Sequence, residues 1–154
     1  MPLQAEIPGR ARLELEFLLA DVNGTLADRG ALIEGVAERL ERLRGVLELR
    51  LLSADTFGTL DAIAARLGAP AERVATGEDK LAVVRALGAE RCVALGNGAN
   101  DLPMVREAAL GIAVVGPEGA SGATIAAADL VCGSIVDALD LLADRRALAA
   151  SLRR

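Results

Sequence analysis

The chain contains no histidine, tryptophan or tyrosine, and only two of its 154 residues, both phenylalanines, are aromatic. Without histidine it has neither the most frequent general base nor the usual zinc ligand, and every Ser-His or Cys-His mechanism is excluded. With so few aromatic rings it also lacks the stacking platforms of proteins that bind single-stranded nucleic acid. The available chemistry therefore rests on carboxylates, amides, hydroxyls, lysine and a hard cation.

Long apolar runs are also missing, although 53% of the residues are hydrophobic. No segment approaches the ~18–20 consecutive apolar residues of a membrane span. The start, "MPLQAEIPGRARLELE", has no basic region followed by an apolar core, so we expect no secretion signal and a cytoplasmic protein. The high apolar fraction mildly favours a homo-oligomer, but alanine-rich packing explains it equally well.

Positive charge is neither abundant nor clustered. The net charge is −5, and the basic residues are scattered along the predicted helices. This distribution argues against nucleic acid or an anionic membrane as a partner.

Cysteine is nearly absent as well. Cys92 and Cys132 are the only two, and each lies in an apolar, strand-like run. Cysteines in such runs are usually small buried hydrophobes, and we expect no reactive thiol. A chain of this length can bury roughly 70% of its unfolded surface, so we expect it to fold without a disulfide or a structural metal.

Extended apolar segments alternate with segments of helical hydrophobic spacing along the chain. After two short extended runs around Pro8-Gly9, Val-, Leu- and Ile-rich strands alternate with predicted helices at 32–45, 56–68, 78–88, 100–109 and 134–154. This alternation indicates a doubly wound, mostly parallel α/β sheet that is covered on both faces. We expect one domain over 1–154, comprising an N-terminal hairpin at 1–16, a core at 17–142 and a C-terminal helix at 143–154.

Polar residues follow four of the predicted strands. In an open parallel sheet the ligand crevice lies beyond the carboxyl ends of the strands, so these side chains should converge there. They are Asp21 and Thr25 after the first strand of the core, Ser53 at the end of the second, Lys80 after the third, and Asn100 and Asp101 after the fourth.

Each of these residues also has an ordinary explanation. Asn23-Gly24 suits a turn, Ser53 or Asp55 suits a helix cap, and Lys80 suits a solvated charge. Two features of the composition favour a site instead. Lys80 is the only lysine in a chain whose other basic residues are all arginine, which suggests a need for a compact ammonium on phosphate. The only three asparagines, Asn23, Asn97 and Asn100, all lie in these loops.

Four segments together resemble the motifs of the haloacid dehalogenase (HAD) superfamily of aspartyl phosphotransferases. They are "DVNGTL", "LLSAD", Lys80 and "GNGANDLPMV". Within that superfamily they look most similar to the phosphorylation domain of P-type ATPases and to its small soluble relatives. The resemblance covers roughly 17–142 and leaves the N-terminal hairpin outside. "DxxGT" alone is a weak signal, but four motifs in order at strand ends are a strong one.

The resemblance implies a nucleophile and a metal site. Asp21 would attack phosphorus and form an aspartyl-phosphate, which divides one difficult displacement into two easier ones. A Mg²⁺ ion would be held by Asp21, the backbone oxygen of Asn23 and Asp101, with Asn97 contributing through a water.

The resemblance also implies how the phosphoryl group is held. Lys80 would offset the charge between Asp21 and the phosphate. Phosphoryl oxygens would be bound by Thr25, Ser53 and the amides near Gly24 and Ala54, with Asp55 and Asn100 as supporting residues.

Two positions depart from the family pattern. Asn23 stands where the phosphatases of the family carry their acid/base Asp, and an amide cannot shuttle a proton at neutral pH. Losing a positioned acid/base typically costs about 10²–10⁴ in rate, so the resemblance predicts a slow phosphohydrolase or phosphotransferase. Asn97 replaces an Asp that supports the metal, which should weaken Mg²⁺ binding.

Two function classes therefore remain open. The first is a Mg²⁺-dependent enzyme that acts on an unidentified phosphorylated substrate. It would be capless, because the gaps between motifs hold little more than one helix and a strand. The second is a domain that binds a phosphorylated ligand or partner without turnover.

Overall fold

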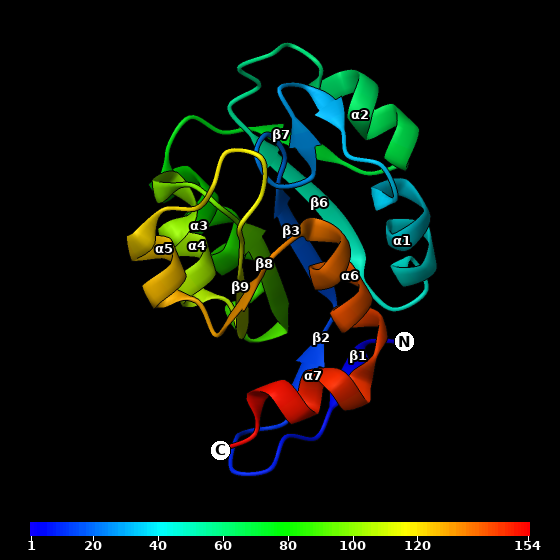
Figure 1. Ribbon diagram of the computed structural model, residues 1–154, viewed down its shortest axis with the longest axis vertical. Helices are drawn as coiled ribbons and strands as arrows, with labels where there is room; N and C mark the ends of the chain where they lie inside the picture. The colour runs from blue at the N-terminus through cyan, green and yellow to red at the C-terminus, as the bar shows by residue number, and fades with distance from the viewer.

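The computed structural model describes residues 1–154 and is built around six parallel strands. These are Phe17–Asp21 (β3), Glu48–Ser53 (β6), Ala71–Arg73 (β7), Cys92–Gly96 (β8), Leu110–Val114 (β9) and Leu130–Cys132 (β10). They form one sheet in the order β10-β9-β8-β3-β6-β7 (Figure 1). The predicted doubly wound parallel sheet is confirmed, and β3 lies near its centre, between β8 and β6.

Helices cover both faces of this sheet. On one side lie Val36–Leu43 (α1), Leu60–Leu67 (α2) and Ile135–Ala143 (α6). On the other lie Gly77–Leu87 (α3), Leu102–Glu107 (α4) and Gly122–Ala127 (α5) (Figure 1). None of the helices has the length and apolar character needed to cross a bilayer.

Alternating side chains of the strands build a separate core on each face. Leu18 and Ala20 of β3 belong to a buried cluster of 30 residues with α1, α2 and α6, whereas Leu19 belongs to a cluster of nine with α3 and α4. Both cysteines are buried in strands as predicted, and burial raises the pKa of the Cys92 thiol to about 11. They act as small core residues.

A two-stranded antiparallel hairpin, Leu3–Ala5 (β1) with Leu13–Leu15 (β2), precedes the sheet. It lies at the amino-terminal end of β3 and packs against the last helix, Arg145–Leu152 (α7) (Figure 1). The final helical segment is not continuous from Ser134, because Asp144 interrupts it. Asp144 Oδ1 accepts the N–H groups of Arg146 and Ala147 at 3.1 Å each and so begins a new helix.

A second hairpin, Ala27–Asp28 (β4) with Ala31–Leu32 (β5), follows β3 directly. The sequence pattern assigned Leu32 to a helix, but Leu32 pairs with Ala27, and α1 begins only at Val36, after Gly35 with φ 87°. Between β3 and β6 the chain thus holds only this small hairpin and α1, and between β6 and α3 only α2 and β7. There is no cap domain.

Gly111 of β9 allows α4 to approach the sheet closely. A Cβ at this position would collide with the backbone carbonyl of Val105. We expect Gly111→Ala to lower the free energy of unfolding by about 1–3 kcal/mol, because backbone must move to admit the methyl group. Denaturant unfolding measures this change. Gly45→Ala is the matched control, since no atom lies within 4 Å of its Cβ position; an equal loss in both variants would contradict the packing explanation.

Candidate active site

The predicted site residues meet at the carboxyl ends of the central strands. Asp21 is the last residue of β3 and Ser53 the last of β6, while Asn97 directly follows β8. Because β3 pairs with both β6 and β8, these three positions are neighbours at one edge of the sheet. Lys80 reaches the same edge from the first turns of α3.

Lys80 joins two carboxylates in the interior of the protein. Its Nζ lies 2.9 Å from Asp21 Oδ1 and 2.6 Å from Asp101 Oδ1. Lys80 and Asp101 are 0% exposed and Asp21 is 7% exposed. The only lysine is therefore not a solvated charge, and the prediction that it lies beside Asp21 is confirmed by the geometry.

One ammonium cannot neutralise two buried carboxylates. Burial, reinforced by the neighbouring charge of Asp101, raises the pKa of Asp21 to about 7 even though Lys80 and Thr25 oppose the shift. Burial alone would lower the pKa of Lys80, but the two carboxylates outweigh it and the net shift is upward. Lys80 thus stays charged, and Asp21 is the group with excess negative charge.

Thr25 connects the nucleophile candidate to the loop after β8. Its Oγ1 lies 3.0 Å from Asp21 Oδ2 and 3.2 Å from Asn97 Oδ1, and the residue is fully buried. A hydroxyl has one proton to donate, so it serves one of these oxygens at a time. Thr25 therefore fixes the Asp21 carboxylate, and its side chain is engaged rather than open to a phosphoryl group.

The turn after Asp21 uses groups that the sequence assigned to ligand binding. Asn23 Oδ1 accepts the N–H of Gly30 at 3.0 Å, which ties it to the tip of the β4–β5 hairpin. The Gly24 N–H donates to Ala27 O at 2.7 Å, so the expectation that this amide holds phosphate is not met in this conformation. The N–H groups of Asn23 and Ala54 donate to no protein acceptor, and they are the amides left for an anion.

The remaining predicted residues are placed in three different ways. Ser53 is buried, and its Oγ accepts the Asp55 N–H at 3.0 Å. Asp55 accepts the Leu60 N–H at the start of α2 and pairs with Arg73 at 3.1 Å, which is the structural role of a helix-start residue. Asn100 is exposed, and its side chain makes no hydrogen bond within the protein.

The oxygen atoms near Asp21 decide which residues suit a hard cation. Both oxygens of Asp101 are taken, Oδ1 by Lys80 and Oδ2 by the N–H groups of Asn97 and Gly98 at 3.0 Å each. In this arrangement the Asp101 carboxylate orients Lys80 and holds the loop after β8, so it is less available to a metal than Asp21 is. Asp21 Oδ2, Asn97 Oδ1 and the Asn23 carbonyl are the oxygens that fit Mg²⁺. No group of three or more His, Cys, Asp or Glu side chains is placed to hold a metal.

One acidic residue at this edge was not found from the sequence. Glu118, in the loop between β9 and α5, brings its carboxylate against Gly24, on the side of Gly24 that the Asn97 side chain also faces. No motif or spacing distinguishes it from the chain's other glutamates, so only the fold could reveal it.

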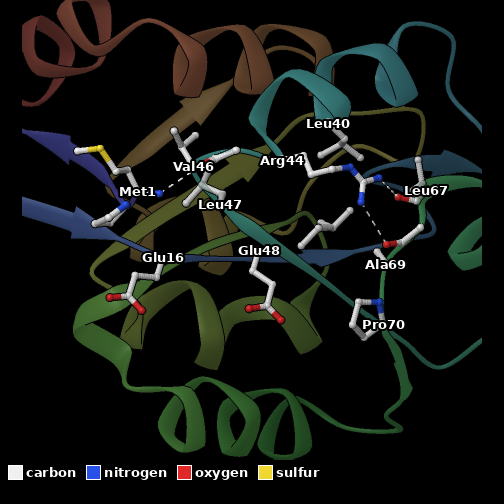
Figure 2. A pocket seen from close by; sticks show the side chains of 14 residues that line it. Met1, Glu16, Leu40, Arg44, Val46, Leu47, Glu48, Leu67, Ala69 and Pro70 are labelled. Carbon is white, nitrogen blue, oxygen red and sulfur yellow. Dashed lines mark hydrogen bonds between the residues drawn. The ribbon is translucent and has the colours of Figure 1, made fainter.

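A cavity of about 390 Å³ lies at the other end of the sheet, near the starts of β6 and β7. Figure 2 shows it between α1 and the start of β6, with Arg44 directed towards Leu67. The Arg44 guanidinium donates to the backbone oxygens of Leu67 at 2.7 Å and Gly68 at 3.5 Å. None of the predicted site residues lines it, and it plays no part in the site around Asp21.

The excess charge on Asp21 has a consequence for stability. Between the ordinary carboxyl pKa near 4 and about 7, folded Asp21 holds a proton that the unfolded chain has released. Its contribution to the free energy of unfolding therefore falls as pH rises through this window. We expect metal-free Asp21→Asn to be more stable than the wild type at pH 8, by on the order of 1–3 kcal/mol, and the gain to shrink at pH 5. Thermal and denaturant unfolding at both pH values measure it.

Asp101→Asn is the contrasting variant. Because Asp101 accepts three hydrogen bonds in full burial, we expect its replacement to destabilise the protein by roughly 3–5 kcal/mol. If both variants lost the same stability, the two carboxylates would be equivalent partners of Lys80 and the charge assignment would be wrong.

Comparison with known proteins places this geometry in a family. An uncharacterised protein of Methanocaldococcus jannaschii is 45% identical over 64 residues, 42% of this chain and 69% of that protein. The cobalt-bound deoxy-D-mannose-octulosonate 8-phosphate phosphatase of Haemophilus influenzae has a similar fold, with a TM-score of 0.70 and 19% identity over 89% of this chain and 91% of that chain.

The corresponding phosphatase of Moraxella catarrhalis, in complex with a magnesium ion, a phosphate ion and KDO, gives a TM-score of 0.66 and 20% identity over 90% of this chain and 94% of that one. The family model for haloacid dehalogenase-like hydrolases matches residues 5–109. That match includes Asp21, Ser53, Lys80 and Asp101, and the chain therefore belongs to the haloacid dehalogenase-like hydrolase family.

Proposed function

We propose that the chain is a Mg²⁺-dependent phosphohydrolase that works through an aspartyl-phosphate on Asp21. The observation that carries this proposal is the fully buried Lys80, held between Asp21 and Asp101 at the carboxyl edge of the sheet. A purely structural salt bridge would not explain why Asp21, the carboxylate with excess charge, lies at the carboxyl ends of the strands, where a ligand can reach it. The fold shared with phosphatases that bind magnesium and phosphate supports the same conclusion.

The geometry divides the first chemical step among few residues. The Asp21 carboxylate, oriented by Thr25 and Lys80, would attack phosphorus, and the leaving group would depart on the side opposite the attacking oxygen. Lys80 uses two of its three N–H donors on carboxylates and has one left for a phosphoryl oxygen. The free N–H groups of Asn23 and Ala54 and the Ser53 hydroxyl would bind the other oxygens.

A bound Mg²⁺ would supply positive charge that lets the anionic carboxylate approach an anionic phosphate. Asp21 and Asn97 would hold it through side-chain oxygens and Asn23 through its carbonyl. The burial of Asp101 then keeps Lys80 in place while Asp21 is engaged with the substrate.

Proton transfer is the weak part of this site. The Asn23 side chain is tied to Gly30 and offers no proton to a leaving group, nor a base to the water that hydrolyses the aspartyl-phosphate. Slow turnover follows, with good leaving groups favoured because they depart without protonation. Without a cap domain, the entrance is bordered only by short loops and the β4–β5 hairpin, so substrate selection rests on these or on a neighbouring molecule.

Phosphate release from acetyl phosphate and p-nitrophenyl phosphate tests the proposed function. With Mg²⁺ we expect slow, saturable release that EDTA abolishes, and no release above background in Asp21→Asn. Intact-mass measurement after acetyl phosphate treatment should show phosphorylated wild type and unmodified Asp21→Asn. Phosphate binding without release or phosphorylation in either protein would reject the enzyme and support a phospho-ligand-binding domain.

Asn23→Asp should restore the missing acid/base. A carboxylate can accept the Gly30 N–H with one oxygen and carry the proton on the other, so the hairpin contact is kept. We expect kcat to rise by at least about tenfold, towards the 10²–10⁴ that a positioned acid/base supplies, with the larger gain on alkyl phosphates. Steady-state rates on alkyl and aryl phosphates measure this change. Equal rates for the wild type and Asn23→Asp on all substrates would contradict the role given to position 23.

A further inference from the structure

Glu118 is the one carboxylate at the site's rim that has no protein partner. It forms no ion pair and no hydrogen bond, while Asp28 pairs with Arg29 and Asp55 pairs with Arg73. A Cβ added to Gly24 would collide with Glu118 Oε2. The same Cβ position lies 2.7 Å from Asn97 Nδ2 and 3.0 Å from Asn97 Oδ1, so both side chains face Gly24. The absent side chain of Gly24 thus leaves space that the Glu118 carboxylate and the Asn97 amide share.

The backbone around Glu118 is fastened to Asn97. Asn97 O accepts the Ser121 N–H at 2.7 Å, and Asn97 Nδ2 donates to Gly119 O at 3.3 Å. On the other side of Glu118, Gly116 approaches the carbonyl oxygen of Gly24 so closely that a Cβ would stand 2.7 Å from it. Both flanks of Glu118 are therefore positioned by the loops that carry the proposed metal ligands.

The charge at these loops is low for a Mg²⁺ site. The Asp101 carboxylate is paired with Lys80, and Asn23 and Asn97 occupy the two positions where the family pattern has further carboxylates. Asp21 is then the only anionic ligand candidate near the Asn97 oxygen. Hard cations in proteins are bound mainly by carboxylates, so a site with one carboxylate would be weak.

Resting on the proposed function, we propose that Glu118 supplies the negative charge that Asn97 does not carry and so completes the divalent-cation site. Its carboxylate, which faces Gly24 from the same side as the Asn97 side chain, acts on the ion or on a water bound to it. The carboxylate that the family pattern has in the loop after β8 is replaced here by one in the loop after β9. Gly24 has no side chain, which leaves space for the Glu118 carboxylate.

Mn²⁺ binding in the absence of substrate tests this proposal without any need for turnover. Titration with MnCl₂, followed by the electron paramagnetic resonance signal of the free ion, gives the dissociation constant. We expect Glu118→Gln to weaken binding by about 10- to 100-fold, the range seen when supporting partners of a metal site are lost. Glu38→Gln on α1 is the matched control, since it removes the same charge from an exposed residue that has no ion pair, and it should leave the constant within about twofold.

The rescue variant decides whether charge is the cause. Adding Asn97→Asp to Glu118→Gln returns one carboxylate to the proposed cation site, from the loop after β8, and should recover most of the lost affinity. Equal affinity in Glu118→Gln and Glu38→Gln, tighter binding in Glu118→Gln, or failure of the rescue would each overturn the proposal. Metal-free thermal unfolding of every variant confirms that the fold is retained.

These outcomes are separate from the test of the proposed function. If the wild type releases phosphate but Glu118→Gln binds Mn²⁺ normally, only the role of Glu118 fails. If the wild type neither releases phosphate nor becomes phosphorylated while Mn²⁺ binding still depends on Glu118, the phosphohydrolase is rejected and the cation site stands.

Discussion

The contact between Lys80 and two buried carboxylates constrains the rest of the molecule. An ammonium removed from water is strongly unfavourable unless it is paired and hydrogen-bonded, so Lys80 can be buried only where Asp21 and Asp101 meet. These carboxylates come from the end of β3 and from the loop after β8, and the lysine comes from α3. The requirement for this contact therefore fixes one helix against the carboxyl ends of two adjacent strands.

The same contact leaves the site with surplus negative charge. Asp101 receives three hydrogen bonds and is the better satisfied carboxylate, whereas Asp21 shares Lys80 and one hydroxyl. The raised pKa of Asp21 expresses this difference. A group that is poorly satisfied in the free protein is stabilised when a cation or phosphoryl group arrives, which is the usual conflict between stability and activity at functional sites.

The sequence predicted those parts of the molecule that depend on local pattern. Alternating apolar runs gave the parallel sheet, and the position of polar residues after strands gave Asp21, Ser53 and Lys80 as neighbours. It could not give the engagement of Asp101 by Lys80 and two backbone amides, because that depends on how the loop after β8 closes in three dimensions. The β4–β5 hairpin was also missed, and Arg29 and Gly30, which adopt left-handed turn conformations, were its available local signal. Glu118 was missed as well, because that residue acquires a distinct environment only through the packing of two loops.

The two asparagines can be understood from the balance of charge at this edge. With Asp at both positions, four carboxylates would share this end of the sheet with a single lysine, and repulsion in the metal-free protein would exceed that already felt by Asp21. Asn23 keeps the acceptor that the Gly30 N–H requires and adds no charge. Asn97 keeps an oxygen beside Thr25 and likewise adds none. Neutral amides thus preserve the geometry of the loops and limit repulsion, at the cost of proton transfer and of cation affinity. Glu118 can restore that affinity from the rim of the site, because solvent screens its charge until a cation binds.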